Sequence, residues 1–160
     1  MTVSDRELIK SAQKGQFSSM ANASDMPAAV AMLHRRHVCV TYTDQANVDL
    51  SIPIMRTDRA IRIVSVRIAT GAAVVADNTN YKTLVLNSGD DANGSPTALT
   101  NTISTTVAGL GFSALTSRAF TPVAAAAELA SGRLVYLTTT TPGSGVDMGM
   151  VVVDVVYEEI

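Results

Sequence analysis

The side chains best suited to bind a metal lie close together, as His34, His37 and Cys39 of the segment HRRHVC. A zinc site needs three or four converging ligands. Two arginines separate the histidines and would repel a cation, and the end of an expected helix falls between them. We interpret the positive residues as a helix C-terminus and Cys39 as a small buried residue of a strand. The segment predicts no metal site.

Two polar loops, DNTN at 77–80 and NSGDDANGSP at 87–96, carry the oxygen ligands that calcium prefers. An EF-hand loop also needs a bidentate glutamate, and the first glutamate after these loops is Glu128. Asp, Asn and Gly also favour tight turns. We therefore expect two surface turns, and we predict no cofactor.

No arrangement of nucleophile and base is recognisable. Ser and Thr are abundant, but no G-x-S-x-G sequence occurs, and a hydroxyl without an adjacent base is not activated. Gly109 and Gly111 lack the rest of a phosphate-binding loop. The carboxylates of Asp154, Glu158 and Glu159 could form a catalytic pair, but the last two end the chain and are expected to be solvated. The sequence therefore predicts no catalytic residues and no enzyme activity.

Composition and charge exclude several classes of partner. The net charge of −2 and pI near 5.6 give no electrostatic basis for binding nucleic acid. With 4% aromatic residues and no Trp, stacking platforms for sugars or bases are scarce. No apolar run reaches the about 18 residues of a membrane span, and no signal-peptide core is present. Only 16% of residues are charged, below the roughly 25% typical of soluble domains, which favours an oligomer.

Residues 1–36 differ in pattern from the rest of the chain. Ser4 and Glu7 have capping-box spacing before a short apolar stripe, and Gly15 can end that helix. Pro27 can begin a second helix with the sequence AAVAMLHRR. Isolated helices of this length are marginal in water. We therefore predict a partly helical arm that packs on its own domain or on a partner chain.

From His37 onward the apolar pattern has a period of two, which predicts strands. The expected strands are 37–42, 48–54 with Pro53 at an edge or bulge, 60–68, 81–86, 99–107 and a piece near Phe120. Residues 123–130 predict a helical turn or a loop. From Arg133 to the C-terminus, two β-rich runs joined by a Thr/Pro/Gly turn predict a closing hairpin.

About eight strands separated by turns predict an all-β fold. We assign residues 37–160 to one antiparallel β-sandwich of the jelly-roll type. An immunoglobulin-like sandwich is the alternative, but the chain lacks that fold's Cys and Trp landmarks.

The strand RAIRIVSVRIATG, the middle segment 99–141 and the closing GMVVVDVVYEEI follow a polar arm. Over roughly residues 38–160 this pattern resembles the jelly-roll decoration, or cement, proteins of tailed bacteriophage capsids. The resemblance implies a homotrimer, made in the host cytoplasm, on the outer capsid surface of the virion. It implies binding to the major capsid protein, bridging of neighbouring subunits and stabilisation of the shell against internal pressure.

We expect partner contacts from the arm, because its Met and Phe side chains have no core of their own. The predicted contact residues in the arm are Leu8, Ile9, Phe17, Met20, Met26 and Met32, supported by the arginines Arg56, Arg59 and Arg62.

Two other functions stay open. A receptor- or glycan-binding head module of a phage tail or fibre would bind its ligand in the loops 77–80 and 87–96, although aromatic residues are few. A hydrolase or isomerase of the cupin type would need a His-rich metal motif that the sequence lacks.

Overall fold

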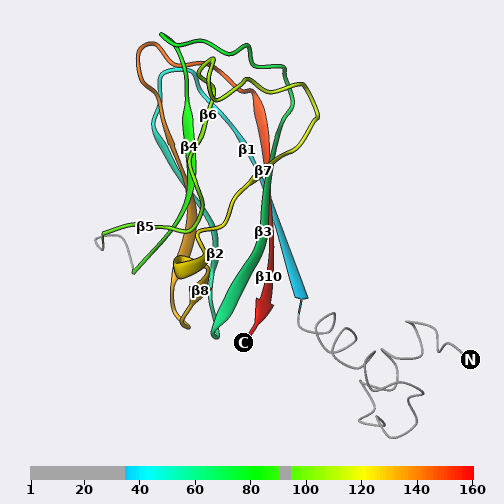
Figure 1. Ribbon diagram of the computed structural model, residues 1–160, viewed down its shortest axis with the longest axis vertical. Helices are drawn as coiled ribbons and strands as arrows, with labels where there is room; N and C mark the ends of the chain where they lie inside the picture. Colours follow the sequence, from blue (N-terminus) through cyan, green and yellow to red (C-terminus); the bar gives the residue numbers. More distant parts are fainter. Residues whose placement is uncertain (1–34, 91–94) are drawn as a thin grey trace, which may run out of the picture.

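The computed structural model describes residues 35–90 and 95–160, which form two antiparallel β-sheets packed face to face (Figure 1). The predicted all-β sandwich is therefore confirmed. Most of the predicted arm lies outside the described residues. Its last two residues, Arg35 and Arg36, were expected to end a helix but belong to the first strand, where Arg35 pairs with Glu158. Backbone pairing with the C-terminal strand extends the first strand to Arg35, two residues before the apolar alternation begins.

The first sheet has the strand order β1-β10-β3-β7, with β8 also beside β3. Its strands are β1 (Arg35–Thr43), β10 (Met150–Glu159), β3 (Ile61–Thr70), β7 (Arg118–Phe120) and β8 (Glu128–Leu129). The second sheet has the order β2-β9-β4-β5, with β6 also beside β4. Its strands are β2 (Leu50–Arg56), β9 (Leu134–Thr140), β4 (Thr83–Gly89), β5 (Thr97–Ala98) and β6 (Ile103–Ser104). The segment 123–130 contains the short 3₁₀ turn η3 (Ala124–Ala126).

The predicted closing hairpin is wrong. β9 pairs with β2 and β4, whereas β10 pairs with β1 and β3, so the two strands lie in opposite sheets. The connection crosses between the sheets through Gly143, Gly145 and Gly149, which all have positive φ angles. Each strand is central in its own sheet. Apolar alternation identified both strands but carried no information on their neighbours.

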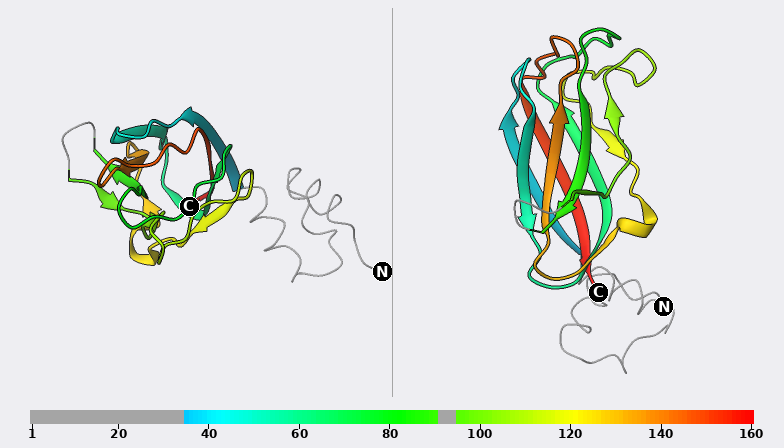
Figure 2. Two further views of the ribbon diagram at one scale, coloured as in Figure 1. Left: turned by 90° about the horizontal axis from the view of Figure 1, so that it is seen from above. Right: turned by 90° about the vertical axis from the view of Figure 1, so that its left-hand side faces the viewer.

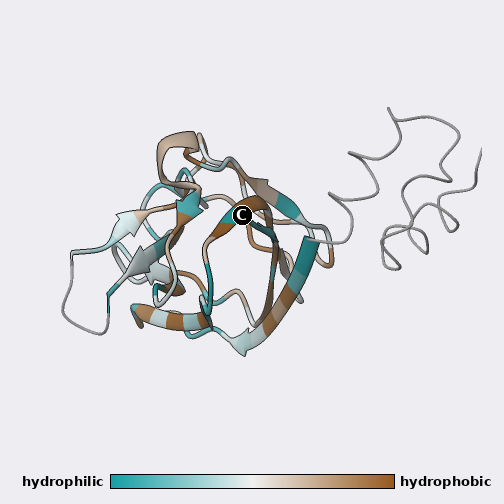
Figure 3. Cartoon of the chain, turned by 90° about the horizontal axis from the view of Figure 1, so that it is seen from below, coloured by the Kyte–Doolittle hydropathy of each residue, from teal (hydrophilic) through white to brown (hydrophobic). Residues whose placement is uncertain are grey.

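The core lies between the sheets and follows the period of two. From β10, Val151, Val153 and Val155 point inward and are fully buried, and they face buried leucines of the second sheet such as Leu84 and Leu137. Figure 2 shows the long strands running along a common axis, and Figure 3 shows apolar and polar residues alternating along them. No helix within the described residues is long and apolar enough to cross a membrane.

The Thr-rich segment 99–107 forms a strand only at Ile103–Ser104. Elsewhere a backbone hydrogen bond runs one way only, as from the Leu99 N–H to Leu86 O, and a side chain supplies the other, because Thr100 Oγ1 accepts the Leu86 N–H at 3.1 Å. Thr105 Oγ1 accepts the Lys82 N–H at 2.9 Å in the same way. Threonine hydroxyls compete with backbone carbonyls for such donors. The segment therefore forms a shorter strand than its Thr-rich pattern predicts.

Pro53 has the position that the sequence predicts. It lies in β2, at the edge of the second sheet, where the register with β9 shifts between Pro53 and Met55. A proline cannot donate to a ladder, so an edge or bulge position accommodates it.

Candidate interaction surfaces

Two loops, residues 71–80 and 105–117, are hydrogen-bonded to each other at the upper end of the sandwich in Figure 1, where β3 ends. Val74 and Phe112 exchange two backbone hydrogen bonds of 2.9 Å. The Asp77 N–H donates to Thr105 O at 3.1 Å, and the Val107 N–H donates to Asn78 Oδ1 at 3.0 Å. The loops therefore form one paired layer.

The glycine pair in the second loop permits close backbone packing. A Cβ atom on Gly109 would lie 2.4 Å from Ser104 O, and one on Gly111 would lie 1.9 Å from Val74 O. Neither position accepts a side chain without displacement of the backbone. The pair thus has a structural role, in agreement with the lack of a phosphate-binding sequence around it.

Arg118 fixes the backbone of this loop. Its guanidinium donates to Gly109 O at 2.7 Å and to Leu110 O at 3.0 Å, and it stacks 4.8 Å from the centroid of the Phe112 ring. Burial lowers the pKa of Arg118. Sequence analysis missed this residue, although it is the single charged side chain between residues 107 and 127.

Four large apolar side chains of this double loop face solvent, and we call them the apolar rim. Their exposed fractions are 82% for Val75, 56% for Val107, 67% for Leu110 and 78% for Leu115. Leu110 and Leu115 have φ angles of 64° and 57°. The left-handed conformation costs a side-chain-bearing residue about 1–2 kcal/mol. Leu115 is held there by a 2.8 Å hydrogen bond from its N–H to Thr70 O.

A fully buried ion pair joins Lys82, which precedes β4, to Asp44, which follows β1. Lys82 Nζ donates to Asp44 Oδ1 and to Gln45 O, while Asp44 Oδ2 accepts the Met148 N–H at 3.0 Å. The Tyr42 hydroxyl is buried without a hydrogen-bond partner among the described residues. Burial and the charge of Asp44 raise the pKa of Tyr42. Sequence analysis missed this ion pair. The feature that could have indicated it is the position of Lys82 directly before an apolar strand.

The loop 77–80 is a turn, as predicted. Asp77 Oδ1 accepts the N–H of Asn80 at 2.9 Å and of Thr79 at 2.5 Å, and these bonds lower the pKa of Asp77. Asn80 Oδ1 accepts the Ser144 N–H at 3.0 Å. One side-chain oxygen each of Asp77, Asn78 and Asn80 is therefore used by the fold. No cluster of three or more metal-binding side chains occurs in the described residues, and 91–94 of the other polar loop lie outside them.

Cys39 is exposed, so its predicted burial is wrong. Strand alternation turns Val38 and Val40 toward the core and places Cys39 on the outer face of β1. His37 lies on the same outer face, with Nε2 against Asp154 Oδ1, an ion pair when the imidazole is protonated. The predicted helix C-terminus around these residues is thus a strand, and His34 lies outside the described residues.

A second group of charged residues lies at the opposite end of the sandwich, where β1 begins and β10 ends, and we call it the ionic end. Arg59 Nη1 is 3.0 Å from Glu159 Oε2, and Arg36 Nε is 3.4 Å from Glu159 Oε1. On the outer face nearby, Arg62 Nε lies 3.4 Å from Glu128 and 3.5 Å from Glu158.

The structure brings together only some of the predicted contact residues. Arg59 and Arg62 both lie at the ionic end, whereas Arg56 ends β2 in the other sheet. The predicted contacts of the arm lie outside the described residues: Leu8, Ile9, Phe17, Met20, Met26 and Met32.

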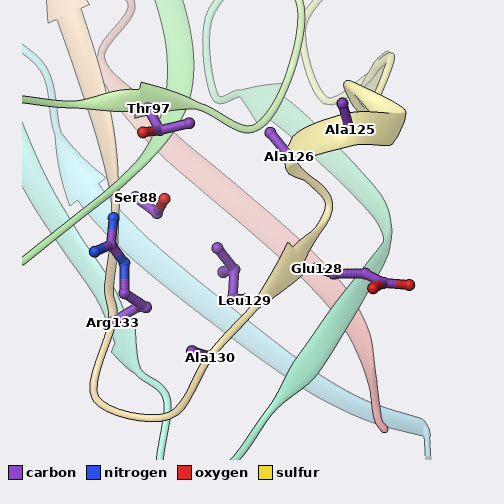
Figure 4. A pocket seen from close by; sticks show the side chains of 8 residues that line it. All are labelled: Ser88, Thr97, Ala125, Ala126, Glu128, Leu129, Ala130 and Arg133. Carbon is purple, nitrogen blue, oxygen red and sulfur yellow. The ribbon is translucent and has the colours of Figure 1, made fainter.

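A shallow pocket of about 320 Å³ lies between η3–β8 and the edge of the second sheet (Figure 4). Its lining is mainly small or apolar, with Ala126 and Leu129 beside Ser88 and Arg133. The side chain of Glu128 points away from it (Figure 4). Arg133 already forms an ion pair with Asp90. The pocket therefore presents no acid and base positioned for catalysis.

Similarity to known proteins is slight. No family model matches the sequence, and no curated protein matches it. Among solved structures, one titled "Structure of infectious bursal disease virus Gx strain" contains a similar chain, with 11% sequence identity and a TM-score of 0.33. The match covers 79% of this chain and 37% of that chain, so the protein spans little more than a third of it. Similarity at this level carries no argument about function.

Proposed function

We propose that the protein is a non-enzymatic structural component of a phage virion that binds the outside of the capsid. In this role it contacts the major capsid protein, bridges neighbouring subunits and stabilises the shell against internal pressure. The observation that carries the proposal is the apolar rim. The four side chains lie on two loops that are hydrogen-bonded to each other, and exposed apolar patches on a protein surface mark sites of contact with other proteins.

The strand order supports a jelly-roll body. A jelly roll has eight strands in two sheets. Here the first four strands alternate between the sheets along the chain, and the last two long strands lie in opposite sheets. β1, β3 and β10 therefore belong to one sheet, and β2, β4 and β9 belong to the other. The short strands complete the two sheets as β7 and β8 beside β3, and β5 and β6 beside β4.

The use of polar side chains supports a role without catalysis. Asp49 Oδ1 accepts both the N–H and the hydroxyl of Thr141, at 2.7 and 2.5 Å. Asp77 and Arg118 are bonded to backbone groups of their own loops. Side chains that could bind a ligand or move a proton are instead used to hold the loops in place.

The proposal includes a homotrimer, which the resemblance to decoration proteins implies, and contacts through the arm, which the sequence pattern of residues 1–36 suggests. Light scattering of the purified full chain tests the first directly, with an expected mass of three times 16.7 kDa. A monomer at micromolar concentration would restrict trimer formation to the shell surface.

The experiment that tests the function is the copy number of this chain in purified particles from its native source, measured by quantitative peptide mass spectrometry. A ratio near one chain per shell subunit supports a protein distributed over the capsid. A few copies per particle would instead indicate the receptor- or glycan-binding module of a tail or fibre. Absence from the particles would refute both.

A further inference from the structure

We infer that the apolar rim is the surface that docks on the shell, and that it binds an uncharged, apolar protein surface there. The inference rests on the proposed function and specifies its contact. It names Val75, Val107, Leu110 and Leu115 as the contact residues, none of which the sequence had suggested.

The chemistry of the rim defines the partner. Residues 71–76 and 107–117 contain no ionisable side chain. The charged residues that border these segments in the chain are bonded internally, Asp77 to backbone N–H groups and Arg118 to backbone carbonyls. An anionic lipid surface or an acidic protein would find no cation within the segments themselves, and the guanidinium beside them is already used by the loop. A sugar would find no exposed aromatic ring, because Phe112 is buried. An uncharged apolar protein surface is the complementary partner.

The backbone of the rim indicates that its leucines are not there for the fold. Asn or Gly would adopt the left-handed conformation of Leu110 and Leu115 with less strain. Leucine gains nothing from burial at these positions, since both side chains are mostly exposed. Strained residues that the surrounding structure holds in place are typical of functional sites.

The rim is also prepared for binding. The two loops are tied together at Val74–Phe112 and Asp77–Thr105, and Arg118 holds residues 109–110. A surface whose backbone is already ordered loses little conformational entropy when a partner binds.

The position of the rim fits a bridging role. It lies where β3 ends, whereas the chain enters the sandwich at Arg35, which pairs with Glu158 near the C-terminus. The rim therefore lies at the end of the body opposite the ionic end. A contact at the rim leaves the ionic end available to a second subunit.

The test uses the full chain with the double substitution Leu110→Asn and Leu115→Asn. The probe is shells of the native particle prepared without this chain, and binding is measured by co-sedimentation at two salt concentrations. We expect at least about tenfold weaker binding, because two large apolar side chains leave the interface. We also expect an unchanged or higher melting temperature, since Asn tolerates positive φ. Binding of the unmodified chain should hardly depend on salt.

The matched control is Val123→Asn, which removes an apolar side chain that is 40% exposed and outside the rim. It should bind the shells like the unmodified chain. If the double variant does not fold, Val75→Ser tests the same surface at its most exposed residue, with the same loss expected.

Three results would overturn the inference. A folded double variant that binds shells with unchanged affinity removes the rim from the interface. A variant that binds normally but no longer self-associates assigns the rim to a second copy of this chain. Failure of the unmodified chain to bind the shells would instead reject the proposed function, and this inference with it.

Discussion

The two ends of the sandwich use their charges differently. Near the apolar rim, Lys82 and Asp44 are buried, and the exposed carboxylates of Asp49, Asp77 and Asp147 each accept a nearby backbone N–H. Large apolar side chains also face solvent there. At the ionic end, Arg59 and Arg36 are exposed and pair with Glu159 on the surface. A soluble domain usually has the arrangement of the ionic end. The comparison teaches that charge at the rim end serves the fold, which leaves the surface there for apolar contact.

The largest effect should follow from Lys82→Met. It leaves Asp44 as an unpaired buried charge, which typically costs about 3–5 kcal/mol of unfolding free energy. Denaturation in urea at neutral pH measures this loss. The double variant Lys82→Met, Asp44→Leu should regain much of the stability, because both charges are then absent. A loss below about 1 kcal/mol for the single variant would contradict a structural role for the pair.

The next largest loss of stability should follow from Gly145→Ala. Gly145 lies in the β9–β10 connection, at the same end of the sandwich as the apolar rim. The new Cβ would lie 2.0 Å from Ala46 O, and φ is 61°. We expect a loss above the roughly 1 kcal/mol that positive φ alone costs. The control is Gly132→Ala, whose φ of 86° is similar but whose Cβ would meet nothing within 4 Å. Equal melting temperatures for the two variants would show that the close approach is unimportant.

A smaller effect is expected at the ionic end. Arg62→Ala removes contacts with Glu128 and Glu158, but Arg62 is about half exposed and such pairs contribute at most about 1 kcal/mol. Thermal melting at low and high salt should show a small difference that salt reduces further. A loss as large as that of Lys82→Met would remove the contrast between the two ends.

The smallest effect concerns Asp49, an exposed carboxylate that bonds Thr141 in the β9–β10 connection. The Thr141 hydroxyl, and then its N–H, lower the pKa of Asp49 below its ordinary 3.8. This contribution to stability is therefore complete above about pH 4 and disappears as the pH falls through the lowered pKa. Asp49→Asn should melt slightly below the unmodified chain at pH 6, and the gap should close toward pH 2. A gap that persists in acid would assign the effect to another cause.

The period-two pattern predicted the long strands β1, β2, β3 and β4 to within a few residues, and Pro53 correctly marked the edge and the register shift. Partners were not predictable, because alternation reports which face of a strand is buried and not which strand lies beside it. The apparent hairpin of β9 and β10 failed for this reason.

The rim and the buried pair escaped sequence analysis for a similar reason. Leu110 and Leu115 are the type of residue that normally enters a core, but the loop holds them at the surface, where Arg118 binds the Leu110 carbonyl and Thr70 O accepts the Leu115 N–H. Lys82 is the type that normally faces water, and its burial depends on Asp44, which is 38 residues away in the chain. Both features depend on contacts distant in sequence.

The threonine hydroxyls of the segment 99–107 have a further consequence for the second sheet. They accept the N–H groups of Leu86 and Lys82 along the side of β4 that faces away from β9. A sheet edge with free N–H groups is a template for strands of other molecules, and such pairing leads to aggregation. The short strands β5 and β6 cover only part of this side of β4, and side chains of the same molecule occupy the two donors beside them, so these donors are not open to another chain.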